Sequence, residues 1–360
     1  MYIFSIFFLL SSIYYFFFPL IFLYSNFLSH KNFFYNEITY IRKLDITNYF
    51  IQYNFFSLIF LFLIFYILYK IFFSPNNIKK IKINYYAYNL VIIICILFLL
   101  KDIFYLIKYY FDNEHINRAL LYMELLNNRR THLNLLIIIS VINFKDNKIL
   151  SYLSYFLISL YSLLSFSRIE LFILLFCHVV TNISYDKKNF LKKFLILISI
   201  IFLIFFYRFI ITGQSFFYLF VEPLHLMISS MIFFKNLLLL NFDIFLHQNI
   251  NFFLKDFFYL PLNFNNYFVY PKIPTYSIRG IDSLFCFFLV FLIYFFILKL
   301  LIQVFYINKY FLNCIFAYLL TSLFRGNFVH NLNFIIKIYF LVILLSWIIN
   351  KIQQSRLRAV

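Results

Sequence analysis

Glycine is nearly absent from this sequence: only three occur in 360 residues. The phosphate-binding loops of nucleotide-driven pumps and nicotinamide enzymes need closely spaced glycines, and neither pattern occurs here. The HExxH pair of metallopeptidases and the GxSxG elbow of serine hydrolases are missing too. A DxD-type metal motif is also missing, so we expect neither a metal nor a cofactor.

Charged residues are scarce as well, at 12% of the chain against 64% hydrophobic residues. This balance is typical of an integral membrane protein and not of a soluble domain. The abundance of Phe and Tyr reflects an AT-rich genome and carries no functional weight. The four cysteines lack the paired spacing of a metal site or a disulfide framework, which favours small buried hydrophobes. They are Cys95, Cys177, Cys286 and Cys314.

The predicted fold class is all-α, with one polytopic membrane domain over residues 1–360. Apolar runs near the length that crosses a bilayer core predict about ten spans. They are 2–24, 49–73, 86–111, 133–145, 149–166, 168–184, 194–211, 284–306, 310–325 and 333–350. The first run lacks a basic n-region and a small-residue cleavage site, so we interpret it as a retained helix and not a signal peptide.

The net charge of +18 comes from lysines and arginines in short loops, which is typical of membrane orientation and not of nucleic-acid binding. The loops after even-numbered spans are basic, as is the C-terminal tail. This pattern predicts both termini in the cytoplasm and a large extracytoplasmic loop at 212–283. The segment 223–240 within that loop is apolar enough to span, but one more crossing would put the basic tail outside. We therefore expect a surface or re-entrant helix there, with Pro223 in its first turn.

Arginines gather on the predicted outer side, whereas lysines gather on the inner side. The arginine guanidinium is a planar fork that binds phosphate in a bidentate way. The pattern predicts a site for a diphosphate headgroup on a lipid, although each arginine alone is also typical of a snorkelling helix-end anchor. The candidate diphosphate ligands are Arg168, Arg208, Arg279 and Arg325.

Four residues are candidates for the catalytic base. Arg168 and Glu170 are two positions apart, so on a helix they face different directions and cannot neutralise each other. Glu222 and His225 are three positions apart and can face one cavity, where either can accept a proton. The alternative for Glu222 is a cap on the helix that Pro223 begins. The catalytic candidates are therefore Glu222, Glu170 and His225, with His330 a further one.

Several stretches resemble the oligosaccharide repeat-unit polymerases of bacterial surface polysaccharide synthesis, the Wzy type of O-antigen polymerase. They are "SFSRIELFILL" (165–175), the "VEPLH" stretch (221–225) in the large loop, and "LFRGNFVHNLNFIIKIY" (323–339). This sequence departs from the pattern of the family at one point: the glycine-rich segment that such proteins carry near the end of the large loop is reduced to "PTYSIRGIDSLF" (274–285).

The resemblance implies an inverting glycosyltransferase that joins polyprenyl-diphosphate-linked repeat units into O-antigen or capsule at the outer face of the inner membrane. Its partners would be the lipid-linked oligosaccharide, membrane lipid and a chain-length regulator. Two alternatives remain open at this point. A flippase for the same lipid would line a central path with charges deep in its helices, and a non-catalytic membrane subunit would need no arginine cluster.

Overall fold

The computed structural model describes most of the predicted helical regions. The described residues are 2–17, 19, 47–73, 79–80, 85–112, 131–165, 167, 169–183, 199, 203, 206, 223, 226–227, 230, 241–260, 280–324 and 326–358. Most of the predicted span 194–211 and of the predicted loop 212–283 therefore lies outside the described residues.

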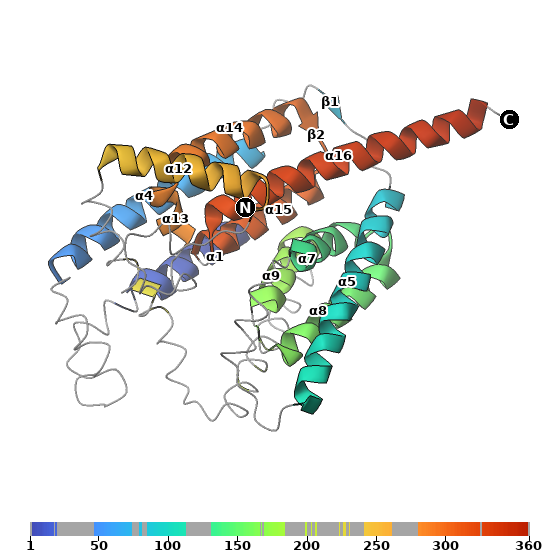
Figure 1. Ribbon diagram of the computed structural model, residues 1–360, viewed down its shortest axis with the longest axis horizontal. Helices are drawn as coiled ribbons and strands as arrows, with labels where there is room; N and C mark the ends of the chain where they lie inside the picture. Colours follow the sequence, from blue (N-terminus) through green and yellow to red (C-terminus); the bar gives the residue numbers. More distant parts are fainter. Residues whose placement is uncertain are drawn as a thin grey trace. The chain divides into compact units, whose positions relative to one another are not determined.

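Helices account for nearly all of the described chain (Figure 1). They are α1 (Tyr2–Ser12) with η1 (Ile13–Phe17), α4 (Thr47–Phe73), α5 (Tyr85–Asp112), α7 (Thr131–Asn143), α8 (Lys148–Leu164), α9 (Ile169–His178) with η2 (Val179–Ile183), α12 (Phe242–Phe257), α13 (Gly280–Cys286), α14 (Phe288–Val304), α15 (Lys309–Phe324) and α16 (Phe328–Arg358). The two short strands are β1 (Lys79–Lys80) and β2 (Phe305–Tyr306), which pair in parallel.

Three described helices are long and apolar enough to cross a membrane: Gln52–Phe73, Tyr86–Asp112 and Phe328–Ser355. A fourth span is possible if α13 and α14, which meet at a 105° bend, count as one broken span. The other apolar helices, such as α7 and α8, have 10–17 residues. The all-helical membrane architecture is thus supported, whereas the number of ten spans remains a prediction.

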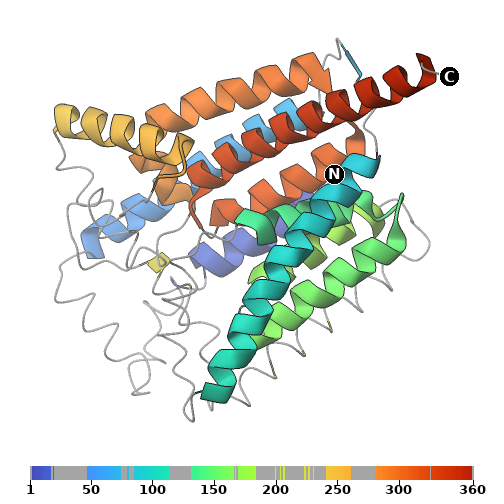
Figure 2. The same cartoon turned by 45° about the vertical axis from the view of Figure 1, so that its right-hand side comes forward.

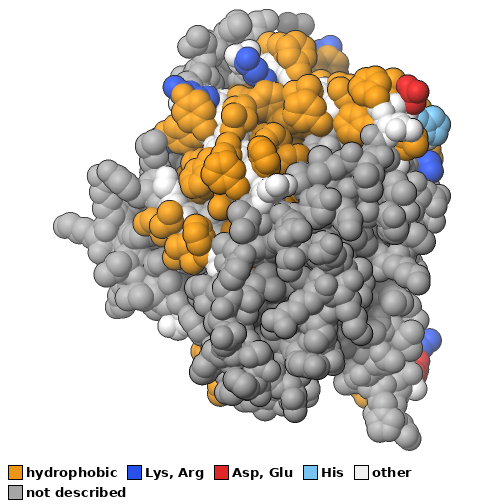
Figure 3. All heavy atoms as spheres, turned by 90° about the vertical axis from the view of Figure 1, so that its left-hand side faces the viewer, with side chains coloured by type: hydrophobic (Ala, Val, Ile, Leu, Met, Phe, Trp, Pro, Cys, Tyr) orange, Lys and Arg blue, Asp and Glu red, His pale blue; other side chains and the backbone are white. Residues whose placement is uncertain are grey.

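The side chains of α4 show why these helices suit lipid. One stripe along α4 is apolar and exposed, and it contains Phe55, Ile59, Phe62 and Tyr66. Polar residues of the same helix, including Ser57, are buried instead. Figure 3 shows such apolar side chains gathered over one face of the described surface. Apolar outside with small polar residues inside is the arrangement of helices that pack within a bilayer.

The chain divides into two compact units, which are described separately. The first unit comprises Met1–Pro75, Gln214–Ile302 and Leu319–Ile336. Its described core joins α1 and α4 through ring contacts such as Phe8–Phe62, whose centroids are 5.0 Å apart. Figures 1 and 2 both show α12 lying beside α13 and α14 in this unit.

The second unit comprises Asn76–Gly213, Gln303–Tyr318 and Lys337–Val360. In it α5, α7, α8 and α9 pack against one another as a helical bundle (Figure 2). The turn between α7 and α8 ends at Asn147, whose side-chain oxygen accepts a hydrogen bond from the Leu150 N–H at 3.1 Å. Such a cap satisfies a backbone donor that the first helical turn leaves unpaired.

Candidate functional site

Helix α12 packs onto the break between α13 and α14 in the first unit. The Asn249 side-chain amide donates to the carbonyl of Cys286, the last residue of α13, at 3.0 Å. The Phe252 ring stacks on Phe287, the residue between the two helices, with centroids 3.7 Å apart. A helix break frees backbone groups that must be paired where water is excluded. Asn249 pairs one such group and Phe252 covers the break.

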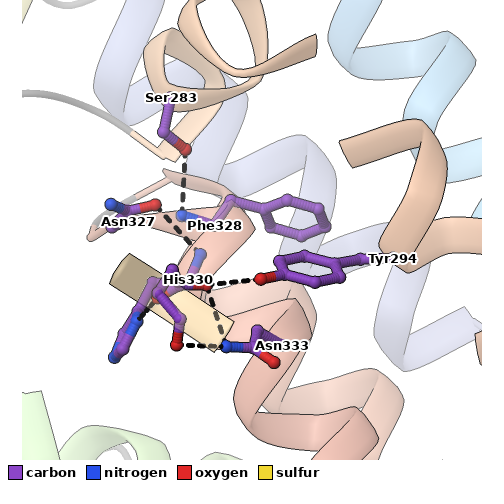
Figure 4. A network of polar contacts seen from close by, with 7 residues as sticks. Ser283, Tyr294, Asn327, Phe328, His330 and Asn333 are labelled. Carbon is purple, nitrogen blue, oxygen red and sulfur yellow. Dashed lines mark hydrogen bonds and ion pairs between the residues drawn. The ribbon is translucent and has the colours of Figure 1, made fainter. Parts of the chain in front are cut away.

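The next residue on this face of α12 is Asp256, whose side chain is fully buried. Its carboxylate accepts hydrogen bonds from Tyr294 Oη at 3.1 Å and from Asn333 Nδ2 at 2.9 Å, and it contacts His330 Nδ1. The Asn333 amide also donates to the backbone oxygen of Asp256 at 2.9 Å. These four residues are called the Asp256 cluster below. Figure 4 shows Tyr294, His330 and Asn333 converging from two helices.

His330 lies in the first turn of α16 and is held at two points. Its backbone N–H donates to the side-chain oxygen of Asn327, the cap of α16, at 3.1 Å. Its ring meets Asp256 through Nδ1, and because an ionised carboxylate only accepts hydrogen bonds, this contact favours the Nδ1–H tautomer. The lone pair of the neutral ring is therefore on Nε2. The side chain is 23% exposed, so the ring is partly open to its surroundings while its carboxylate partner is sealed.

The turn between α15 and α16 is packed against the start of α13. A Cβ atom on Gly280 would lie 2.0 Å from the backbone oxygen of Ser322 and 2.8 Å from that of Gly326, so only glycine fits. The Ser283 hydroxyl then accepts a hydrogen bond from the Phe328 N–H at 3.1 Å (Figure 4). This junction sets where α16 begins, and hence where His330 is presented.

Tyr259, the second residue after α12, adopts an unusual backbone conformation. Tyr259 has φ 54°, a left-handed conformation usually taken by glycine or asparagine at the end of a helix. The N–H of Leu260 donates to the Lys255 oxygen at 2.8 Å, which closes the helix end. The ring of Tyr259 faces the ring of His330 edge-on, with centroids 6.3 Å apart. A strained residue costs about 1–2 kcal/mol and is common at functional sites.

A second buried carboxylate lies within α13. Asp282 is fully buried and accepts hydrogen bonds from the hydroxyls of Tyr53 and Ser230. Tyr53 comes from α4 and Ser230 from the predicted helix at 223–240. This group ties three segments of the first unit together at the start of the broken span.

The Asp256 cluster has the arrangement of a general base with an orienting acid. A carboxylate that fixes one ring nitrogen of a histidine leaves the other nitrogen to accept a proton, and it stabilises the imidazolium that results. Asn333 and Tyr294 in turn fix the carboxylate. Among the described residues, no three His, Cys, Asp or Glu side chains group in a way that could hold a metal ion. The pairing of buried Asp256 with partly exposed His330 is suited to moving a proton at Nε2 of His330.

Most of the residues predicted for the site lie outside the described residues. This applies to the catalytic candidates Glu222 and His225 and to all four candidate diphosphate ligands, Arg168, Arg208, Arg279 and Arg325. Their roles remain predictions. Pro223, Leu226, Met227 and Ser230 are the described residues of 223–240, and all four are helical and buried.

Glu170 is, besides His330, the catalytic candidate that the structure describes. It lies in the first turn of α9 and accepts a hydrogen bond from the Ser167 hydroxyl. An acidic residue there also interacts favourably with the helix dipole. Glu170 belongs to the second unit, whereas Asp256 and His330 belong to the first.

Sequence reasoning considered His330 but missed Asp256, Asp282, Tyr294 and Asn333. The segment 242–257 lies within the predicted loop 212–283 but forms α12 in the structure, and its residues Asn249, Phe252 and Asp256 recur at helical spacing. That spacing was the available signal for α12 and for its buried face.

Comparison of the chain with models of protein families, with curated proteins and with solved structures finds no match.

Proposed function

We propose that this protein is a membrane glycosyltransferase that polymerises polyprenyl-diphosphate-linked oligosaccharide units, with His330 as its general base and Asp256 as the residue that orients it. The single observation that carries the proposal is the contact between buried Asp256 and partly exposed His330 at the start of a membrane-compatible helix. A transferase whose donor is already activated by diphosphate needs a base and a place for the leaving group. The Asp256 cluster supplies the first.

The proposed reaction starts with a hydroxyl group of the acceptor sugar near His330. Nε2 accepts the hydroxyl proton as the oxygen attacks the anomeric carbon of the donor from the face opposite the diphosphate. The bond between that carbon and the diphosphate oxygen breaks, and its electron pair leaves with the lipid diphosphate. Asp256 stabilises the imidazolium until the proton is released to water. Configuration at the anomeric carbon is inverted by this single displacement.

The leaving group must be stabilised by positive charge, and the predicted arginines offer it. Arg325 is five positions before His330 in the sequence, and Arg279 directly precedes Gly280. Both therefore flank, in the chain, the junction that presents His330. We assign Arg279 and Arg325 to the diphosphate of the leaving group, because guanidinium groups bind phosphate oxygens in pairs.

The test is the ladder of surface glycan in a strain that lacks this gene and carries a variant copy. His330→Ala is expected to slow chain growth by about 10²–10⁴-fold, because it removes the base, and to leave a single capped repeat unit. Asp256→Asn should have a similar effect, since it turns the orienting acceptor into a group that can also donate.

The matched control is His247→Ala. His247 is exposed on α12 and is hydrogen-bonded to Asn251. This variant should give a normal ladder at equal protein levels. A normal ladder in His330→Ala would refute the assignment of the base, and loss of even the single repeat unit in the gene deletion would refute the polymerase itself.

A second candidate function is transport of the same lipid-linked oligosaccharide, and one observation favours it. The 105° break between α13 and α14 lies beside buried Asp282, and broken helices with buried charges are typical of transporter binding sites. A flippase would still show its defect in the ladder assay, but as loss of the single capped unit. The same experiment therefore distinguishes the two functions.

A further inference from the structure

Helix α12 carries three different faces along its 16 residues. The first face is buried against the protein and consists of Asn249, Phe252 and Asp256. The second is apolar and exposed. Its members recur every three or four positions and are Phe242, Leu246, Ile250, Leu254 and Phe257.

The third face is polar and consists of Asp243, His247, Asn251 and Lys255. Asp243 and His247 are exposed, and Asn251 and Lys255 are half-buried. These residues also recur every four positions, on the side of the helix away from the protein. Ile244 and Phe258, near the two ends of the helix, depart from the pattern.

We propose that α12 lies in the plane of the membrane surface, with its apolar face in the hydrocarbon boundary of the lipid bilayer and its polar face in water. Length supports this orientation, because 16 residues extend about 24 Å and a bilayer core measures about 30 Å. A spanning helix would also put the polar face into hydrocarbon, which is costly. A helix in water would leave five large apolar side chains uncovered on one side.

The occupant of the apolar face is lipid and not a second protein, because the neighbouring pair α13 and α14 together is long and apolar enough to form a broken membrane span. Tyr294 of α14 contacts α12 through the ring of Phe253 and the carboxylate of Asp256. The apolar residues Leu292, Ile293 and Phe296 of the same helix are exposed, as the apolar face of α12 is. α12 therefore joins a surface that already suits hydrocarbon and adds a polar edge to it. Such helices rest about 5–10 Å into the boundary between headgroups and acyl chains.

This orientation fixes the depth of the Asp256 cluster. Around the axis of α12, Asp256 lies between the direction of the polar residue Lys255 and that of the apolar residue Phe257. In the proposed orientation its carboxylate is therefore at the level of the lipid headgroups. The inference about α12 does not depend on the proposed function. Where that function holds, it adds that the base works at the depth of the diphosphate of a lipid-anchored substrate.

The experiment uses tryptophan fluorescence of the full-length protein in vesicles. The single tryptophan, Trp347, is first replaced in Trp347→Phe. Ile250→Trp then reports on the apolar face and Asn251→Trp on the polar face, one residue away. The vesicles contain lipids brominated either near the headgroup end of the acyl chain or near the bilayer centre. Leu246→Trp and His247→Trp form a second pair in case one variant of the first fails to fold.

The expected result is severalfold stronger quenching of Ile250→Trp than of Asn251→Trp, with the shallow bromines more effective than the deep ones. Asn251→Trp should instead be quenched by aqueous iodide. Equal quenching of both positions by deep bromines would mean that α12 spans, and absence of lipid quenching at Ile250→Trp would mean that protein or water covers the face. Either result overturns the proposal. Because fluorescence needs no activity, a normal glycan ladder in His330→Ala would refute the proposed function and leave this result intact.

Discussion

Replacing Gly280 by alanine is the sharpest test of how the site is held together. The added Cβ would lie 2.0 Å from the Ser322 oxygen, 2.8 Å from that of Gly326 and 2.9 Å from that of Leu323, where real contacts do not fall below 3.0 Å. All three atoms belong to the backbone, so no side-chain rotation can relieve the clash. The start of α13 must therefore move by about 1 Å or more from the turn between α15 and α16.

That movement has two energetic consequences. Overpacking costs about 1–3 kcal/mol, and the hydrogen bond from the Phe328 N–H to Ser283 is worth about 1 kcal/mol more. We expect Gly280→Ala to lower the free energy of unfolding by about 2–4 kcal/mol. Because Phe328 is two residues before His330, glycan polymerisation should fall as well.

Two measurements check this expectation: the midpoint of thermal unfolding in detergent and the glycan ladder at equal protein levels. Ser283→Ala is the control, because it removes the hydrogen bond from the Phe328 N–H and the one that the hydroxyl donates to the Gly280 oxygen, without the clash, and should cost about 1–2 kcal/mol. Gly280→Ala unfolding no earlier than Ser283→Ala would refute the steric reasoning. It would show that the two segments are not packed as tightly as the distances indicate.

Two further substitutions separate the stability of the site from its chemistry. Asn333→Leu removes the donor to both the carboxylate and the backbone oxygen of Asp256, so it should lower the free energy of unfolding by about 1–3 kcal/mol. The rate of polymer growth should fall as well, because Asp256 loses a group that holds its carboxylate in place. Asn308→Ala removes the cap that accepts from the Phe311 N–H at 2.7 Å, so it should cost about 1 kcal/mol and leave the rate unchanged at equal protein levels. Thermal unfolding and the glycan ladder measure both effects, and equal loss of rate in the two variants would contradict a positioning role for Asn333.

The positions of the long helices were largely predictable from the sequence. The predicted spans 49–73 and 86–111 correspond to α4 and α5 within two residues at each end. Apolar runs give a strong signal because a bilayer requires them, and polar residues mark their limits. The last helix is longer than the predicted span 333–350, because Asn327 caps it early and its polar C-terminal turns remain helical.

The break at Phe287 and the buried Asp256 were not predictable from the same reasoning. The sequence around the break, "LFCFFLV", contains no proline or glycine, and its bend depends on Asn249 and Phe252 from a distant segment. Asp256 is buried only because Tyr294, His330 and Asn333 pair with it. Hydropathy treats each residue alone, whereas these positions depend on partners up to 77 residues away.

Base composition gives the junction at Gly280 a further meaning. Glycine codons begin with two guanines, so mutation in an AT-rich genome continually removes them, and only three glycines remain in this chain. Two of the three, Gly280 and Gly326, stand against each other where α13 meets the turn before α16. The close backbone contacts leave no room for a side chain at Gly280, so the fold itself gives a reason for glycine at this position. Diverging copies of this gene should therefore exchange their lipid-facing phenylalanines freely long before either of these glycines is lost.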